Sequence, residues 1–297
     1  MSEPDTVRGT VRIRGSAPAA PHIVDTLIEE RARQLRTNPV TWFLIQRLLY
    51  PALRYKAAIQ MADAIASLSG REVFGFIGNK LNLKLEIGGL EHVPREGACM
   101  IVANHPTGIV DGIALFEALK GRRDDLCFVA NRDALRVSPG LAVVVIPVEG
   151  VMEKRTLAKT REMWRLTRAA FDQGRAVVMF PSGRVAQLRG FRLVDRAWQS
   201  AAIAFATRNK IPIVPLHIEA WNSWIYYLFS RTSAELRDMT LFNELLNKKG
   251  TKFILRFGPQ IEHSDLGGDP EQEIVRLRRY IEDRLSKGER RGSYHFK

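Results

Sequence analysis

From about residue 83 onward, short apolar runs of strand length alternate with longer segments of helical periodicity. This alternation is typical of α/β domains, because each helix carries the chain back so that the next strand runs parallel to the last. The pattern predicts an α/β fold with a mixed, largely parallel sheet flanked by helices. The expected strands are residues 83–87, 99–103, 126–130, 142–148, 176–180, 211–218 and 252–257, and the expected helices are 110–120, 155–173, 196–208 and 270–287.

The chain before this domain has a different pattern, with helices expected over residues 24–36 and about 40–67. In the second helix, apolar side chains recur at three- and four-residue steps, and basic residues lie elsewhere on its surface. Such an amphipathic helix can lie in a membrane interface or pack on a protein core, and both interpretations stay open. Three regions are expected: a disordered leader (1–22), a helical, membrane-docking segment (23–82), and the α/β domain with a basic C-terminal helix and tail (83–297).

The positive charge of the chain lies mainly at its two ends. The formal net charge is +13, with a pI near 10.1; residues 31–84 carry +7 and residues 276–297 carry +5. Anionic lipid, an acidic carrier protein and nucleic acid are all compatible with this charge. No recognised nucleic-acid-binding motif is present, which disfavours nucleic acid.

The apolar stretches and the cysteines bear on the compartment. No apolar stretch reaches the ~18 residues of a membrane-spanning helix, since Arg47, Pro51 and Arg54 interrupt the longest candidate. The first residues lack the apolar core of a secretory signal. Cys99 and Cys127 lie in apolar, strand-like runs, which indicates free thiols in a reducing cytoplasm.

The segment Val102–Leu115 places a histidine where a predicted strand gives way to a predicted helix. In such a loop His105 can face a cleft, and a carboxylate on its far ring nitrogen would hold it in one tautomer as a general base. Asp111, at the start of the next helix, is the candidate partner, and Gly108 lets the loop turn sharply. A polar turn in which Asp111 only caps the helix explains the same residues, so both alternatives stay open.

A second group of polar residues follows the predicted strand that ends at Phe180. Pro181 and Gly183 indicate a turn at the sheet edge where ligands of parallel sheets bind. Ser182 lacks the Gly-x-Ser-x-Gly elbow of a nucleophilic serine, which disfavours that role. Arg184 beside a glycine turn suits an anionic head group, and the alternative is a solvated surface charge.

A third segment, Ile211–Phe229, runs from a proline-bounded strand into an aromatic cluster. The aromatic side chains suit an acyl-chain groove, an interfacial belt or simple core packing. His217, within the strand, is expected to be a core histidine with satisfied hydrogen bonds. Neither a metal-ligand spacing nor a GxxxxGK[ST] or GxGxxG loop is present, so no metal and no nucleotide cofactor is expected. The aromatic cluster comprises Trp221, Trp224, Tyr226, Tyr227 and Phe229.

The order of these motifs resembles the glycerolipid acyltransferase family, the 1-acylglycerol-3-phosphate acyltransferases. Asn-His-Pro with a downstream Asp, a Phe-Pro-x-Gly turn and a Val-Pro strand follow one another over roughly residues 83–260. By position, the resemblance makes His105 the base and Asp111 its orienting partner. It places the Phe180–Arg184 turn at the acceptor head group and Ile213-Val214-Pro215 near the acyl site. The substrate-binding residues that it implies are Asn104, Gly108, Arg132, Arg155, Pro181, Ser182, Gly183 and Arg184.

Three departures from the family pattern are visible. Five residues separate His105 and Asp111 instead of four, and the turn reads FPSGRV where the family has Phe-Pro-Glu-Gly-Thr-Arg. The second family block reads VVVIPVEGV, with Lys154 and Arg155 only later. These features, together with HIEAWNSWIYYL, look like the branch of hemolysin-like proteins and ornithine-lipid-type O-acyltransferases. The resemblance then implies acyl transfer without fixing lysophosphatidate as the acceptor.

The implied reaction moves a fatty acyl group from an acyl thioester to a lysolipid hydroxyl, with His105 as general base. The acyl carrier protein or coenzyme A thioester is a co-substrate, and no other cofactor is expected. Backbone amides around Gly183 are candidates for steadying the oxyanion. The expected place is the cytoplasmic face of a membrane, peripheral on its anionic surface and without nucleic acid. A lipid hydrolase, a non-catalytic lipid-binding protein and, with less support, a nucleic-acid-binding module remain alternatives.

Overall fold

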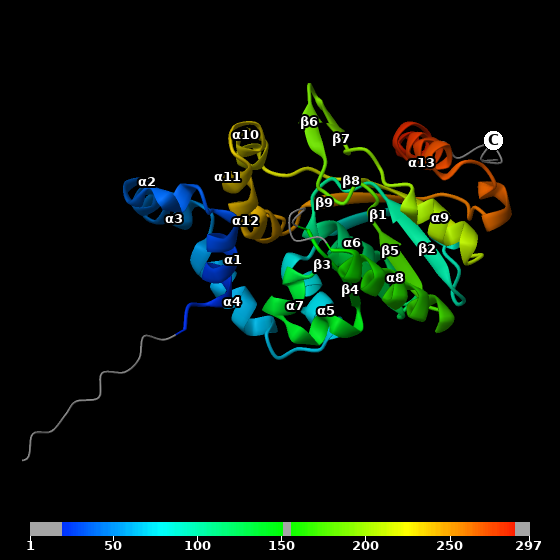
Figure 1. Ribbon diagram of the computed structural model, residues 1–297, viewed down its shortest axis with the longest axis horizontal. Helices are drawn as coiled ribbons and strands as arrows, with labels where there is room; N and C mark the ends of the chain where they lie inside the picture. The colour runs from blue at the N-terminus through cyan, green and yellow to red at the C-terminus, as the bar shows by residue number, and fades with distance from the viewer. Residues whose placement is uncertain (1–19, 151–155, 289–297) are drawn as a thin grey trace, which may run out of the picture.

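The computed structural model describes residues 20–150 and 156–288, and these residues build a seven-stranded sheet in the order β1-β9-β8-β2-β5-β3-β4. Within the described sheet, β8 and β9 pair antiparallel and every other neighbouring pair is parallel. The predicted mixed, largely parallel sheet is therefore confirmed (Figure 1). Its strands are β1 (Lys84–Gly88), β2 (Cys99–Ala103), β3 (Leu126–Asn131), β4 (Val145–Val148), β5 (Ala176–Met179), β8 (Ile213–Glu219) and β9 (Lys252–Phe257).

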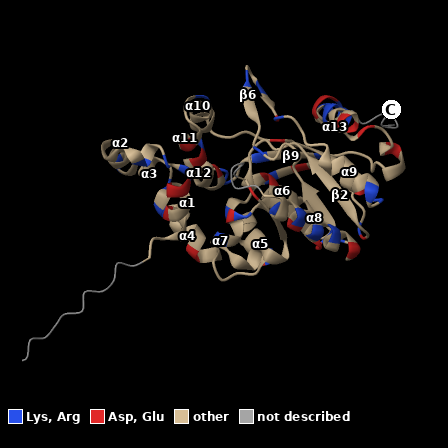
Figure 2. Ribbon diagram, in the orientation of Figure 1, with Lys and Arg blue, Asp and Glu red and all other residues tan. Residues whose placement is uncertain are grey.

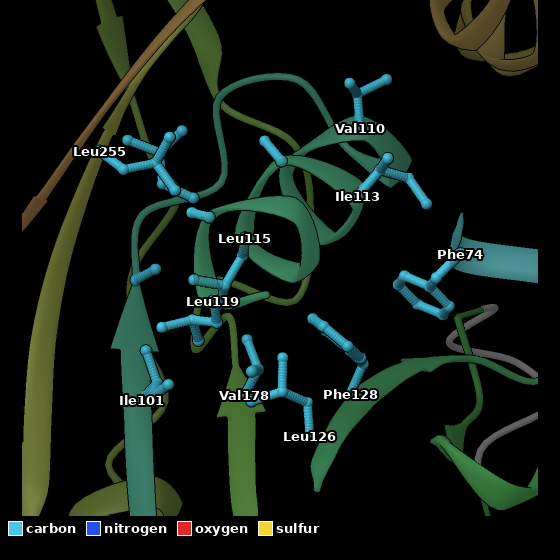
Figure 3. Packing of buried hydrophobic residues seen from close by; sticks show 14 of the residues in the cluster. Phe74, Ile101, Val110, Ile113, Leu115, Leu119, Leu126, Phe128, Val178 and Leu255 are labelled. Atoms are coloured by element: carbon cyan, nitrogen blue, oxygen red, sulfur yellow. The ribbon is translucent and has the colours of Figure 1, made fainter. Parts of the chain in front are cut away.

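Helices cover both faces of this sheet, because the central strands are apolar on both sides. One face packs on α5 (Gly70–Leu81) and α6 (Ile109–Leu119), and the other on α8 (Leu157–Asp172), α9 (Ala201–Arg208) and α13 (Pro270–Arg279). In β2, Ile101 faces the first layer while Met100 and Val102 face the second. Figure 3 shows the first layer, where sheet residues such as Leu126 and Phe128 meet α6 and the Phe74 ring of α5.

The predicted elements of the α/β domain match the structure with shifts at their ends. The strands at 99–103 and 252–257 have the predicted bounds, whereas β4 starts only at Val145 because Pro139–Val143 forms a 3₁₀ helix. The last helix is regular to Arg279 and continues as π and 3₁₀ turns to Lys287. Several elements lack any counterpart among the predictions: α5, α7 (Asp133–Val137), the hairpin of β6 (Gln187–Arg189) and β7 (Arg192–Val194), α10 (Trp224–Thr232), α11 (Ala234–Met239) and α12 (Leu241–Leu246).

The N-terminal helices are shorter and more broken than the periodicity predicts. The first, α1 (Ile23–Arg31), ends five residues before the predicted boundary. The second becomes α2 (Pro39–Leu44), a π-helical turn (Ile45–Leu49), α3 (Tyr50–Ala52) and α4 (Tyr55–Ile65). The break falls at Arg54, whose φ of 56° lies in the left-handed region and cannot continue a helix. Residues 1–19 of the predicted leader lie outside the described residues.

The amphipathic segment packs on the protein with one face and leaves another exposed, so the core-packing interpretation is confirmed for the first face and membrane docking of the second stays a prediction. Ile45 and Leu53 are buried in an apolar cluster that joins α1 and α4 to Met239 of α11. Phe43, Leu44 and Leu48 are exposed instead. Among residues 20–150 and 156–288, no helix combines the length and the apolar character that crossing a membrane requires.

Candidate active site

The loop between β2 and α6 brings His105 and Asp111 together at the carboxyl end of β2. Asp111 is the third residue of α6 and is fully buried. Its carboxylate accepts hydrogen bonds from the backbone amides of Thr107 and Gly108, each at 3.0 Å. Gly108 has φ 93° and ψ −127°, a conformation that glycine adopts without strain. Asp111 therefore does cap the helix, and the same carboxylate also faces the histidine.

The His105 ring is held on two sides. Its Nδ1 atom lies 2.9 Å from Asp111 Oδ2, an ion-pair distance, and the ring stacks on Phe180 with centroids 4.2 Å apart. The contact is not aligned as a hydrogen bond, and within the described part of the chain Nδ1 has no hydrogen-bond partner. Catalytic hydrogen bonds are often poorly aligned until substrate binds. Because Nδ1 faces Asp111, Nε2 is the nitrogen at the opposite side of the ring, and the side chain is 18% exposed.

The backbone of His105 is clamped by a part of the chain that the sequence patterns did not single out. The Asp195 carboxylate accepts the His105 N–H at 3.2 Å, and Ala186 N–H donates to the His105 carbonyl at 2.8 Å. Trp198 Nε1 donates to the same carboxylate at 3.0 Å. Burial raises the pKa of Asp195 to about 6, although His105 and Trp198 act against the rise. No periodicity or motif spacing could have revealed this contact, since it joins residues 90 positions apart.

The Phe180–Arg184 turn lies directly beside this loop. A Cβ atom on Gly108 would sit 3.1 Å from Val185 Cγ2, so the two loops touch. Ser182 is buried and its hydroxyl donates to the Arg184 carbonyl at 2.8 Å, which agrees with the absence of a nucleophile motif. Gly183 N–H donates to the Phe180 carbonyl at 2.9 Å. The turn itself uses the Gly183 donor, so the expectation that backbone amides around Gly183 steady an oxyanion stays a prediction for the neighbouring amides only.

Arg196 lies within electrostatic range of three other arginines, and one of them, Arg184, belongs to this turn. Burial lowers the pKa of Arg196, and the positive charges of Arg184 and Arg237 lower it further. Arg237 is paired with Asp238 at 2.6 Å. The buried Nε of Arg196 has no hydrogen-bond partner among the residues that the structure describes. Such a group of guanidinium ions favours an anionic ligand.

Of the other predicted substrate-binding residues, Asn104 has a structural role and Arg132 lies farther along the sheet edge. Asn104 Nδ2 donates to the Ile218 carbonyl at 2.8 Å, and Ile218 N–H donates to Asn104 Oδ1 at 2.7 Å. This bridge extends the pairing of β2 with β8, so the amide orients the loop. Arg132 follows β3 and pairs with Glu162 of α8 at 2.5 Å. Pro181 is buried in the turn, and Arg155 lies outside the described residues.

The aromatic segment after β8 divides between core and surface. Tyr226 and Tyr227 are buried, whereas Trp221 and Trp224 are exposed, so core packing explains only part of the cluster. The Tyr227 hydroxyl accepts the backbone amide of Asn222, whose side chain donates to the Thr107 carbonyl at 3.4 Å. The segment thus supports the His105 loop.

The expectation for His217 is wrong in one respect. Its buried Nδ1 has no hydrogen-bond partner within the described residues. Burial, with the nearby Arg256, lowers the pKa of His217 to about 4, so the ring is neutral near pH 7.

Comparison with known proteins gives matches to lipid acyltransferases. Residues 84–219 match the acyltransferase family model. The chain is 30% identical over 188 residues to a lyso-glycine lipid O-acyltransferase of Phocaeicola vulgatus, a match that covers 61% of this chain and 65% of that protein. It is 26% identical over 187 residues to a lyso-glycine lipid O-acyltransferase of Bacteroides thetaiotaomicron, covering 61% and 67%.

A structural match covers more of the chain at lower similarity. The 1-acyl-sn-glycerophosphate acyltransferase of Thermotoga maritima is 13% identical and matches 92% of this chain and 98% of that chain, with a TM-score of 0.48.

Proposed function

We propose that this protein is an O-acyltransferase that moves a fatty acyl group from an acyl thioester to the hydroxyl of a lysolipid. The observation that carries the proposal is the His105 ring, 2.9 Å from the fully buried Asp111 and beside the Phe180–Arg184 turn. The family match over residues 84–219 supports it, because this segment contains both loops and the Ile213-Val214-Pro215 strand.

In the proposed reaction His105 acts as general base and forms no covalent intermediate. Nε2 takes the proton of the acceptor hydroxyl as that oxygen attacks the thioester carbonyl carbon. The tetrahedral intermediate then collapses, the carbon–sulfur bond breaks, and the leaving thiolate takes the proton back from the imidazolium. Asp111 stabilises the imidazolium while it exists. A positioned base of this kind contributes ~10²–10⁴ in rate.

The acceptor that we propose is a lysolipid with an acidic head group. The two bacterial relatives are named for lyso-glycine lipid, and the Arg184 and Arg196 guanidinium groups here would attract such a head group. Gly108, Pro181 and Ser182 would shape the site, while Asn104 would orient its loop. Arg132 is paired with Glu162, so it would have to release this carboxylate before it could bind substrate.

The donor and the location are proposed on charge and exposed apolar surface. The net charge of +13 suits an acyl carrier protein or coenzyme A thioester, both of which are acidic. The exposed Val40, Phe43 and Leu48 of the N-terminal helices suit docking on the cytoplasmic face of a membrane.

The test is an assay on purified protein with liposomes. Acyl-carrier-protein and acyl-coenzyme A donors would be offered with lyso-glycine lipid, lyso-ornithine lipid and lysophosphatidate. We expect transfer with one or more pairs, and a fall of at least ~10²-fold in His105→Ala, which should stay folded because the ring is partly exposed. Free fatty acid release without a lysolipid would instead indicate a hydrolase. Vesicle binding without any turnover would favour a non-catalytic lipid-binding protein.

A further inference from the structure

The β6–β7 hairpin exposes an aromatic side chain at its tip. Strands β6 (Gln187–Arg189) and β7 (Arg192–Val194) pair antiparallel, and Figure 1 shows the hairpin projecting from the body of the molecule. Phe191 at the turn is 97% exposed. A single exposed apolar side chain is common on protein surfaces, so the hairpin tip indicates a partner only together with other exposed apolar residues along the same edge.

Two other elements with exposed apolar side chains lie along the same edge of the ribbon as the hairpin tip. In Figure 1 the hairpin tip, α10 and α2 lie along one edge, although they come from distant parts of the chain. On α10, Trp224 is 74% exposed, and on α2 Phe43 is 64% exposed. A flat apolar surface can touch all three elements at once, whereas a small ligand cannot.

Basic side chains lie beside each of these apolar contacts. Arg189 and Arg192 pair across the hairpin and flank Phe191 (Figure 2). Arg231 lies in the last turn of α10 and Arg47 lies in the π-helical turn after α2; both are exposed. Exposed aromatic residues with basic neighbours match the interface of an anionic bilayer, where aromatic rings sit at head-group level and basic residues attract the lipid charge.

We propose that the tip of the β6–β7 hairpin inserts into an anionic membrane surface, with the exposed faces of α10 and α2 as the other contacts. The proposed docking surface therefore includes the hairpin and α10 as well as the N-terminal helices. It determines which side of the α/β domain faces the lipid. It rests on the proposed function in that the acceptor is a lipid, but docking itself requires no turnover.

The hairpin also connects the membrane contact to the catalytic loop. Ala186, just before β6, donates to the His105 carbonyl, and Asp195, just after β7, accepts the His105 amide. Phe191 is the fifth residue after Ala186, and five steps of ~3.3 Å span roughly 17 Å of extended chain. Insertion of the tip therefore holds the His105 loop close to the head groups, where a lysolipid hydroxyl is found.

The first experiment places a reporter at the tip. Phe191→Cys would carry an environment-sensitive fluorophore, which labels this position selectively because Cys99 and Cys127 are buried. With vesicles of phosphatidylcholine and phosphatidylglycerol we expect a blue-shifted emission. With phosphatidylcholine alone the shift should be weaker, since the basic residues then lack lipid charge. A reporter that stays in water while the protein sediments with vesicles would overturn the proposal.

The second experiment measures vesicle partitioning of the otherwise native protein. Phe191→Asp should lower the partition coefficient about tenfold, because a charge replaces the ring that would enter the bilayer. The matched control is Val143→Asp, because Val143 is also an exposed apolar residue (58%). It lies before β4, at the amino-terminal ends of the parallel strands, whereas the hairpin follows the carboxyl end of β5. Equal vesicle binding by Phe191→Asp and the wild type would refute the proposal. A blue shift of the fluorophore at position 191 that appears without vesicles, on adding acyl carrier protein or on self-association, would refute it as well.

His105→Ala separates this proposal from the proposed function. The variant should bind vesicles as the wild type does. If vesicle binding depends on Phe191 but the wild type has no transferase activity, the docking proposal is supported and the proposed reaction is refuted. If the wild type transfers acyl groups but its vesicle binding does not depend on Phe191, the reaction is supported and the docking proposal is refuted.

Discussion

At the scale of single residues, Asp111 can cap its helix and serve the proposed base at the same time. Its carboxylate accepts two backbone amides of the loop and also faces His105, so the group that holds the loop also lies against the proposed base. Burying a carboxylate completely is costly unless several such hydrogen-bond donors surround it. The sequence pattern could not choose between the two roles because both require an aspartate at this position.

Asp195 predicts a pH dependence of stability. Its pKa is raised from 3.8 to about 6 on folding, chiefly by burial, so the folded protein binds the proton more tightly than the unfolded chain. Stability contributed by this proton is full below pH 4 and is lost as the pH rises to about 6. Between pH 4 and 7 we expect the free energy of unfolding of Asp195→Asn to gain about 2–3 kcal/mol relative to the wild type.

Urea unfolding of both proteins at several pH values measures this difference. The contributions of the other titrating groups to the unfolding free energy cancel, because both proteins carry these groups. A constant difference over this range would mean that Asp195 is ionised at low cost. The Asn variant should also keep the His105 loop in place, because its amide oxygen can still accept a hydrogen bond.

At the scale of elements, the site depends on the ends of strands rather than on their interiors. The loops that follow β2 and β5 carry His105 and the Phe180–Arg184 turn, and the carboxyl ends of these paired parallel strands meet at one edge. The register, with Met100 opposite Val177, brings the two loops into contact. Strand prediction together with this rule was enough to place both loops at the same edge of the sheet, whereas the structure shows that β2 and β5 are neighbours.

The turn at Gly108 is the most constrained part of this arrangement. In Gly108→Ala, the backbone at φ 93° becomes strained and the new methyl group meets Val185 at 3.1 Å. We expect a loss of about 1–3 kcal/mol of unfolding free energy and a clear fall in kcat, since the loop carries His105.

Gly97→Ala is the matched control, because Gly97 also has a positive φ (82°) but open space around its Cβ position. It should lose stability without losing kcat. If both variants keep full activity, the Gly108 turn does not position the base.

At the scale of the whole molecule, a buried ion pair joins the peripheral helices to the site. Lys248 Nζ lies 2.7 Å from Glu244 of α12, and Glu244 also accepts hydrogen bonds from Ser223 at the start of α10. Burial opposes the charge on Glu244, but Lys248 and Ser223 outweigh it and lower the pKa of this carboxyl. Burial lowers the pKa of Lys248, and Glu244 offsets part of that effect.

Removing one member of this pair should cost more than removing both. Lys248→Met leaves a buried carboxylate unpaired, and we expect a loss of about 3–5 kcal/mol of unfolding free energy. The double variant Glu244→Gln with Lys248→Met should recover part of that loss. A double-mutant cycle by chemical unfolding measures the coupling; strict additivity would show that the pair does not act as a unit.

The sequence by itself determined the seven strands of the main sheet, the sheet class and the catalytic candidates His105 and Asp111, because periodicity and local motif spacing need only neighbouring residues. It did not predict the clamp by Asp195, the gathering of Arg184, Arg196 and Arg237, or the place of the hairpin. These join segments that approach one another only once the strand order β8-β2-β5 is formed. Such long-range contacts leave no periodic signal in the chain, so the tertiary structure alone decided which side chains surround the base and which edge exposes apolar residues.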